Sequence, residues 1–186
     1  SDYAALTEDQ KAYAKTFFDE MIFPVLTPLG YDPGRPFPHI SNMSLNLALT
    51  VRVPNGPERF ARVKVPNTLP RLLPMPSVPD PSGNGTAPKD SYFVWIDQVI
   101  AEHLQTLFPG WQVLEAHPFR VTRDAEVVIQ ELEAEDLLET VERSVRERRF
   151  GSVVRLTTEP TMPDGILSIL IDNLNIEPGD VYTVPP

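Results

Sequence analysis

The sequence predicts an α+β protein: a two-layer sandwich of a mixed or antiparallel sheet and about three helices. Residues 45–53 alternate apolar and polar side chains, and a Pro-Asn-Gly-Pro turn separates them from a second alternating run at 60–65. This pattern is typical of a β-hairpin. Apolar residues recur at helical spacing in residues 7–22 and 131–150. Strands linked by a hairpin favour this class over a doubly wound fold.

The first helix is expected over residues 7–22, because Thr7 and Gln10 have the spacing of a capping box and Pro24 ends the pattern. Residues 22–42, which follow it, contain five prolines among twenty-one residues. Proline fixes φ and lacks an N–H, so this connector is expected neither inside a helix nor in a central strand. Its apolar side chains nevertheless require burial.

The other elements follow from local patterns. Two prolines confine the strand at 69–75 to an edge, and the helix at 131–150 begins with acidic residues and ends with arginines. We expect, in order, an edge strand at 69–75, an exposed loop at 76–90, a strand at 91–95, a helix at 97–107, a strand at 111–122 interrupted near His117-Pro118, a helix at 131–150, a strand at 153–157, a helix at 164–174 and a strand at 181–184.

Composition excludes several classes of protein. The chain has 186 residues, 41% of them hydrophobic, which is typical of a folded domain rather than a disordered tail. It has no apolar run of the length of a membrane span and no signal-peptide pattern at its start. It has no cysteine, so it has no disulfide, thiolate nucleophile or cysteine-ligated metal. We therefore expect a cytoplasmic protein.

The charge of the chain is zoned. The net charge of −10 disfavours a nucleic-acid partner, but residues 51–75 carry five basic residues and one acidic residue. Residues 76–136 carry three basic and eleven acidic residues. Twelve of the sixteen cations are arginine, whose planar guanidinium suits oxyanions.

Four arginines are candidates for contact with an anion. Alternation places Arg52 and Arg62 on the hairpin face opposite the apolar side chains, where they could meet a polyanion, an acidic neighbour or only water. Arg120 and Arg123 are three residues apart, so a regular strand directs them to opposite faces unless a bulge redirects one.

No catalytic motif is present. The sequence lacks a P-loop, a GxGxxG and a GxSxG motif. His39, His103 and His117 do not have the three- or four-residue spacing of a two-histidine metal site on one helix, and we expect them to be structural or solvated. We expect no metal and no catalytic residue.

Several motifs, in order along nearly the whole chain, resemble the middle (head) domain of the polyphosphate kinase family. They are PVLTPLGYDPGRPFPHISNMSLNLAL, RFARVKVPNTLPRLLPMP, LFPGWQV, HPFRVTRDAE, EAEDLLETVERSVRERRFGSVVRL and DVYTV. The resemblance implies a fold like that of phosphohistidine phosphatases. It also implies that residues 1–22 are the last helix of an N-terminal helical domain and residues 23–186 the middle domain. The loop at 76–90 is longer and richer in proline than the family pattern.

The resemblance further implies a parent enzyme that transfers the terminal phosphate of ATP to inorganic polyphosphate through a phosphohistidine. ATP and Mg²⁺ would serve that parent, whose catalytic histidines lie beyond residue 186, and this segment would hold no cofactor and be inactive alone. Its expected partners are the catalytic C-terminal domains of the same chain, a second subunit and polyphosphate. The parent would be cytoplasmic or membrane-associated.

In this interpretation the segment scaffolds the catalytic half and contributes to dimer contacts. Arg120, Arg123, Arg52 and Arg62 are then candidates for lining a polyanion path. The connector would fix the orientation of the middle domain relative to its neighbours. Four of its apolar residues are candidates for inter-domain packing: Phe23, Leu26, Phe37 and Ile40. The simpler alternative is that the connector is an ordinary buried crossover, in which the prolines serve only stability. Two other functions stay open: a free-standing phosphohistidine phosphatase-like enzyme that uses His39 or His117, and a pure interaction module.

Overall fold

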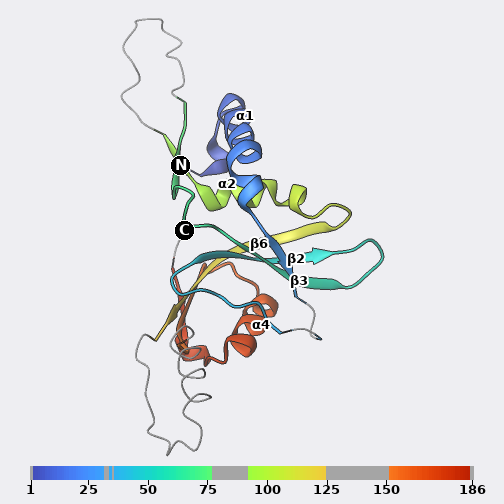
Figure 1. The fold of residues 1–186 in the computed structure, drawn as a ribbon, viewed down its shortest axis with the longest axis vertical. Helices are drawn as coiled ribbons and strands as arrows, with labels where there is room; N and C mark the ends of the chain where they lie inside the picture. Colours follow the sequence, from blue (N-terminus) through green and yellow to red (C-terminus); the bar gives the residue numbers. More distant parts are fainter. Residues whose placement is uncertain (1, 32–33, 35, 77–91, 125–150, 185–186) are drawn as a thin grey trace, which may run out of the picture.

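A six-stranded mixed sheet forms the centre of the computed structural model, which describes residues 2–31, 34, 36–76, 92–124 and 151–184. The strand order is β1-β3-β2-β6-β7-β8, and all neighbours are antiparallel except β7 and β8 (Figure 1). The strands are β1 (Pro28–Gly30), β2 (Leu45–Arg52), β3 (Glu58–Lys64), β6 (Gln112–Arg123), β7 (Val153–Thr158) and β8 (Val181–Thr183). The α+β class with a mixed sheet is thus confirmed.

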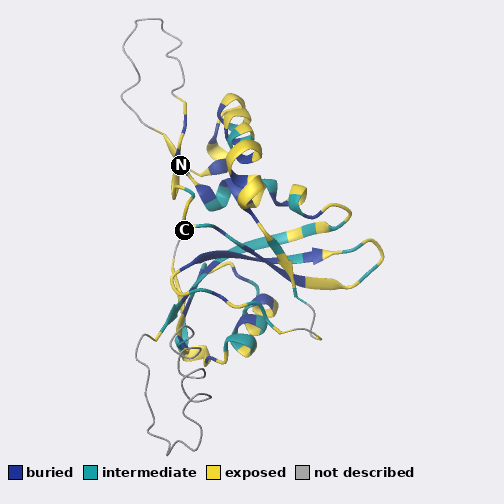
Figure 2. Cartoon of the chain, viewed as in Figure 1, coloured by how far each residue is buried: buried dark blue, intermediate teal, exposed yellow. Residues whose placement is uncertain are grey.

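Helices cover both faces of this sheet (Figure 1). The described α-helices are α1 (Glu8–Phe17), α2 (Ile96–His103) and α4 (Asp164–Leu174). We call the face under α1 and α2 the upper face and the face under α4 the lower face. One buried apolar cluster lies on each face, and dark blue residues line the sheet from both sides in Figure 2. The prediction of two layers is therefore wrong, because helices pack on both faces of the sheet: β2 places Leu47 and Leu49 in the upper cluster, while Ala48 of β2 and Phe60 of β3 belong to the lower one.

The first helix begins where its cap predicts. Thr7 Oγ1 accepts a hydrogen bond from the Gln10 backbone N–H at 3.3 Å, and Gln10 Oε1 accepts one from the Thr7 N–H at 3.1 Å. The helix continues as a π-turn over Phe18–Ile22 and a 3₁₀ turn over Phe23–Val25, where Pro24 ends it. Phe18 and Ile22 are fully buried in the upper cluster.

The connector runs from the upper to the lower face. Leu26 is buried in the upper cluster, and Ile40 is buried in the lower cluster with Phe37 packed beside it. Between them β1 pairs with β3 at the sheet edge, where a strand tolerates proline because one side of it has no neighbour. Phe23 is 43% exposed, so the described chain does not bury it, and its packing against another domain stays a prediction.

The strand at 111–122 is not interrupted at Pro118. Strand β6 runs continuously from Gln112 to Arg123, and Pro118 lies opposite Leu47 of β2. Pairing with β7 begins only at Phe119, so Pro118 lies in the part of β6 that has a strand on one side only. Its missing N–H is tolerated there as on an edge strand.

The remaining strands form a small ribbon. Strands β4 (Leu72–Pro74) and β5 (Phe93–Trp95) pair as a separate two-stranded sheet, which β5 connects directly to α2. The predicted helix at 131–150 and all of the predicted loop at 76–90 except Pro76 lie outside the described residues. Among the described helices, none is both long and apolar enough to cross a membrane.

Candidate functional site

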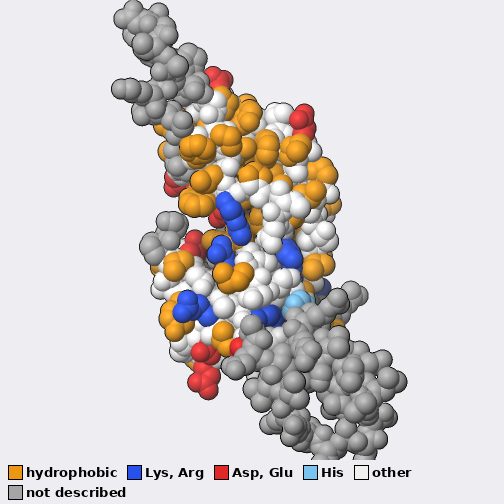
Figure 3. Space-filling model, turned by 60° about the vertical axis from the view of Figure 1, so that its left-hand side comes forward, with side chains coloured by type: hydrophobic (Ala, Val, Ile, Leu, Met, Phe, Trp, Pro, Cys, Tyr) orange, Lys and Arg blue, Asp and Glu red, His pale blue; other side chains and the backbone are white. Residues whose placement is uncertain are grey.

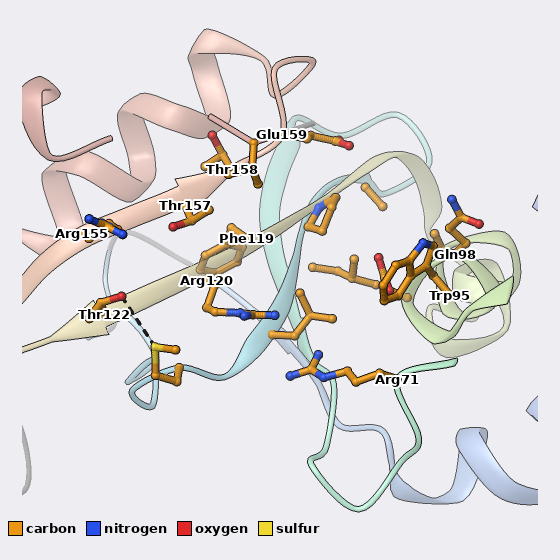
Figure 4. Close-up of a pocket in the computed structure, with 18 residues that line it drawn as sticks. Arg71, Trp95, Gln98, Phe119, Arg120, Thr122, Arg155, Thr157, Thr158 and Glu159 are labelled. Carbon is orange, nitrogen blue, oxygen red and sulfur yellow. Dashed lines mark hydrogen bonds between the residues drawn. The ribbon is translucent and has the colours of Figure 1, made fainter. Parts of the chain in front are cut away.

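A cleft of about 700 Å³ opens on the upper face of the sheet, between the β4–β5 ribbon with α2 on one side and strands β6 and β7 on the other. Its walls come from segments far apart in the sequence, as Figure 4 shows. The volume lies within the range of small-molecule sites, about 300–1,000 Å³.

Three arginines line the cleft. Arg71 precedes β4, Arg120 lies on β6 and Arg155 lies on β7. In Figure 4 the side chains of Arg71 and Arg120 point into the same space. Blue side chains gather around the hollow between the upper and lower parts of the molecule in Figure 3.

Sheet register alternates arginine and threonine on this wall. Arg120 lies opposite Thr157, and Thr122 lies opposite Arg155. Since cross-strand partners share a face, two guanidiniums and two hydroxyls project from the same patch of sheet. Each of these groups can donate hydrogen bonds, so the patch suits a ligand with many acceptor oxygens.

The arginines differ in what holds them. The Arg155 guanidinium lies over the Tyr182 ring, 4.4 Å from its centroid, which fixes its direction. Arg71 and Arg120 form no side-chain hydrogen bond or ion pair with the described residues. Two cations that point into one space repel each other, and an anion between them would relieve that repulsion.

Two carboxylates share the cleft. Burial raises the pKa of Asp97, and the nearby Arg71 and Arg120 act in the opposite direction. Glu159 is engaged elsewhere, because its Oε1 lies 2.6 Å from His117 Nδ1. Asp97 therefore sets the negative end of the cleft and the arginines its positive end.

The end near α2 is apolar and aromatic. Trp95 is 47% exposed and lies beside this end, with Gln98 behind it in Figure 4. The floor below consists of Leu45, Leu47 and Pro118 from the upper face of the sheet. The cleft thus has an apolar floor, with Trp95, Asp97 and Gln98 at its α2 end and with arginine and threonine on the wall formed by β6 and β7.

Of the four arginines predicted from the sequence, only Arg120 lines the cleft. Arg52 is on the exposed end of the hairpin and pairs with Glu58. Arg62 is only 5% exposed and donates from Nη1 to the His39 carbonyl at 2.8 Å. The prediction that Arg62 lies on an exposed outer face is therefore wrong, because the connector covers it.

Arg123 holds the chain together rather than facing the cleft. Its Nε donates to the Ile40 carbonyl at 2.9 Å and its Nη1 to the Gly151 carbonyl at 2.7 Å. Arg123 lies on the face opposite Arg120, as their spacing of three residues predicts for a regular strand; the register shift beside it leaves the extra residue, Val154, on β7. Arg71 and Arg155 were missed because no sequence spacing relates residues 71, 120 and 155.

The three histidines are separate from one another. Burial, and then Arg123, Arg62 and Lys64, lower the pKa of His39. His103 packs against Phe18, with ring centroids 4.9 Å apart. His117 lies between the carboxylates of Glu115 and Glu159. In the described part of the chain, no group of three or more His, Cys, Asp or Glu side chains could hold a metal ion.

Known proteins resemble the chain over almost its whole length. Residues 9–186 match the family described as polyphosphate kinase middle domain. Polyphosphate kinase 1 of Chlorobaculum tepidum is 46% identical over 183 residues, which cover 98% of this chain and 26% of the relative. A polyphosphate kinase of Aphanizomenon baltica is 47% identical over 185 residues, which cover 98% of this chain and 48% of the relative.

A solved structure has a similar fold. The crystal structure of polyphosphate kinase from Porphyromonas gingivalis aligns with a TM-score of 0.74 at 24% sequence identity. The alignment covers all of this chain and 25% of that chain. The chain therefore spans about a quarter of that structure, and a quarter to a half of the two relatives named above.

Proposed function

The chain belongs to the polyphosphate kinase middle-domain family, and we propose that it is the non-catalytic middle domain of an enzyme that extends inorganic polyphosphate from ATP. In this proposal the phosphohistidine chemistry belongs to other domains of the same enzyme, which would also hold ATP and Mg²⁺. The single observation that carries the proposal is the family match over residues 9–186.

The connector supports the scaffold part of the proposal. It is stiff, because proline leaves few backbone states, and it is buried at Leu26 and Ile40 on opposite faces of the sheet. Phe23 is half-exposed at its start and is free to pack against another domain. Such a connector holds neighbouring domains, and the second subunit of a dimer, at a defined angle.

The cleft supports the polyanion part. Arg71, Arg120 and Arg155 converge on a wall that also carries the hydroxyls of Thr122 and Thr157. Polyphosphate offers only acceptor oxygens and negative charge, which this wall complements. We therefore place the polyphosphate path of this domain in the cleft, at Arg120 rather than at Arg52, Arg62 or Arg123.

Titration of the 186-residue chain with long-chain polyphosphate, at about 50 mM and about 500 mM salt, tests the polyanion part. Polyphosphate is expected to bind at low salt and to lose affinity steeply at high salt, because salt screens exposed charge pairs. Arg120→Gln should weaken binding, whereas Arg52→Gln, which removes an equal charge outside the cleft, should not. Equal effects of the two variants, or no binding at low salt, would reject the polyanion path.

The scaffold part has its own test in the longer kinase that carries this domain. Phe23→Ala should lower kcat for polyphosphate synthesis while costing the isolated chain only about 0.5–1.5 kcal/mol of stability, because Phe23 is half-exposed here and loses one edge-to-face ring contact, with Phe18. Met21→Ala is the matched control, since Met21 is 55% exposed and precedes the connector. Unchanged kcat in Phe23→Ala would contradict a positioning role for this side chain.

A further inference from the structure

Three consecutive residues of the connector, 39–41, each accept a hydrogen bond from a different cation. The bonds run from Arg62 Nη1 to the His39 carbonyl at 2.8 Å, from Arg123 Nε to the Ile40 carbonyl at 2.9 Å and from Lys64 Nζ to the Ser41 hydroxyl at 3.1 Å. We call Arg62, Lys64 and Arg123 the crossing cations. They come from β3 and β6 and meet where the connector passes over the sheet.

The crossing cations lie on the face of the sheet opposite the cleft. Arg62 lies opposite Ala48 of β2, which is buried in the lower cluster, and Lys64 follows two positions later on the same face. Arg123 likewise follows Val121, a member of the lower cluster, by two positions on β6. The crossing is therefore separate from the cleft on the upper face.

The charge at the crossing is not neutralised by the described residues. None of the three crossing cations forms an ion pair there, and each bonds only neutral acceptors. Arg62 is only 5% exposed, and its Nε has no hydrogen-bond partner. A buried charge is normally paired, because burying it without a partner is costly. An anion is the partner that this arrangement lacks.

The crossing cations are also close to one another. Burial is the main cause that lowers the pKa of His39, and all three crossing cations add to it, so they act on a single imidazole. Lys64 and Arg123 are partly exposed and keep N–H groups that bond no described residue. A phosphate group carries about two negative charges at neutral pH and offers several acceptor oxygens, so it can bond two such cations at once.

We propose that the crossing binds one phosphate group, with Lys64 and Arg123 donating hydrogen bonds to it at the surface and Arg62 supplying positive charge beneath. Orthophosphate and the end of a polyphosphate chain share this chemistry. The bound group joins β3, β6 and the connector, and it stabilises the passage of the connector over the lower face. The inference does not rest on the proposed polyphosphate path, because it uses other cations on the opposite face of the sheet.

Titration of the 186-residue chain with orthophosphate, and separately with tripolyphosphate, tests the site. Both titrations omit divalent cations and hold the ionic strength constant with chloride, so that screening does not change. Backbone amide NMR spectra locate each ligand on the chain. We expect orthophosphate to shift the amide signals of residues 39–44, Lys64 and Arg123 along one saturable curve. Tripolyphosphate should shift the same signals, and a path in the cleft would add signals from β6 and β7 around Arg120.

The main variant is Lys64→Gln, because Lys64 is partly exposed and its replacement leaves the apolar cores intact. It should weaken orthophosphate binding about tenfold, the effect of losing one charge-assisted hydrogen bond. Lys64→Arg keeps the charge and should retain most of the affinity. Arg59→Gln is the matched control, because Arg59 is an exposed cation of the same strand, and it should change nothing. Arg120→Gln, in the cleft, should also leave orthophosphate binding unchanged.

The outcomes separate this site from the polyphosphate path. If neither ligand shifts the signals of the crossing, the proposal is overturned, whatever happens in the cleft. Equal weakening by Lys64→Gln and Arg59→Gln would also overturn it, because it would indicate diffuse attraction to any cation. Shifts at the crossing that Lys64→Gln weakens and Arg120→Gln does not would support the site, even if the cleft gives no response and the path is rejected.

Discussion

At the scale of single residues, the position of an arginine, rather than the number of arginines, decides whether its guanidinium can meet an anion. The four candidates from the sequence have three different environments: Arg52 is in an exposed ion pair, Arg62 and Arg123 donate to backbone carbonyls, and Arg120 lines the cleft. The carbonyls that Arg62 and Arg123 bind belong to consecutive residues, His39 and Ile40, of the connector. These two cations therefore hold the connector in place.

The first prediction concerns this anchoring. Arg123→Ala removes two charge-assisted hydrogen bonds to carbonyls, each worth about 1.5–3 kcal/mol, and should lower the free energy of unfolding clearly. Arg52→Ala removes an exposed ion pair, whose typical contribution is about 0–1 kcal/mol. Urea denaturation of the two variants measures the difference. Equal destabilisation would show that Arg123 does not anchor the connector.

The second prediction concerns pH. Burial is the main cause that lowers the pKa of both His39 and His103; cations add to it, chiefly Arg123 for His39 and Lys15 for His103. In the unfolded chain both histidines titrate near the ordinary value of about 6.5. Below that pH the unfolded state binds protons that the folded state does not, so stability should fall as pH decreases from about 7.5 to about 5.5.

Thermal unfolding across this pH range, in the wild-type chain and in the double variant His39→Gln/His103→Gln, checks the sign. The melting temperature of the double variant should depend less on pH in this window, because neither glutamine titrates. An equal or steeper decline in the double variant would mean that other groups control the pH dependence.

At the scale of elements, the N-terminal helix is part of the sheet's own core. Phe18 and Ile22, at the end of this helical segment, lie in the upper cluster with side chains of β2 and β3. The boundary between an N-terminal domain and the middle domain at residues 22–23 stays a prediction. The packing of the helix on the sheet nevertheless ties its stability to that of the sheet.

The third prediction follows from this packing. Phe18→Ala should destabilise the entire chain by about 3–5 kcal/mol, because it leaves a cavity in the upper cluster. Thr7→Ala, which removes only the cap of α1, should cost about 1 kcal/mol. Circular dichroism and tryptophan fluorescence should report one common transition for both variants. A helix signal lost before the sheet signal in Phe18→Ala would show that the helix folds separately.

At the scale of the whole molecule, one sheet separates two cores. Strand β2 contributes Leu47 and Leu49 to the upper cluster and Ala48 to the lower one, so a single strand connects both. This arrangement places α1 and α2 over one part of the upper face and leaves the surface over β6 and β7 open as the cleft (Figure 1). The position of the cleft is thus a consequence of how far the helices extend across the sheet.

The fourth prediction is that the two cores unfold together. Ile100→Ala in the upper cluster and Leu170→Ala in the lower one should each cost about 2–5 kcal/mol. Because they lie in separate clusters, the double variant should equal the sum of the singles within about 0.5 kcal/mol. Two resolved transitions in the denaturation curve of either single variant would instead indicate that the cores are independent units.

The elements themselves could be predicted from the sequence because their causes are local. The cap at Thr7 and the alternation in the hairpin act over a few residues, and they placed α1, β2 and β3 within a few positions. The expected interruption at Pro118 was wrong because the tolerance of a strand for proline depends on its neighbours in the sheet.

The sequence by itself determined the class of the fold, the zoning of charge and the apolar side chains available for burial, since each of these depends on residue type and local spacing. Only the tertiary structure decided which cations meet. Arg71, Arg120 and Arg155 converge because strand order and register bring three distant segments to one face, and Arg62 is buried because the connector crosses over it. Register is set by packing of the whole sheet, which no short stretch of sequence contains.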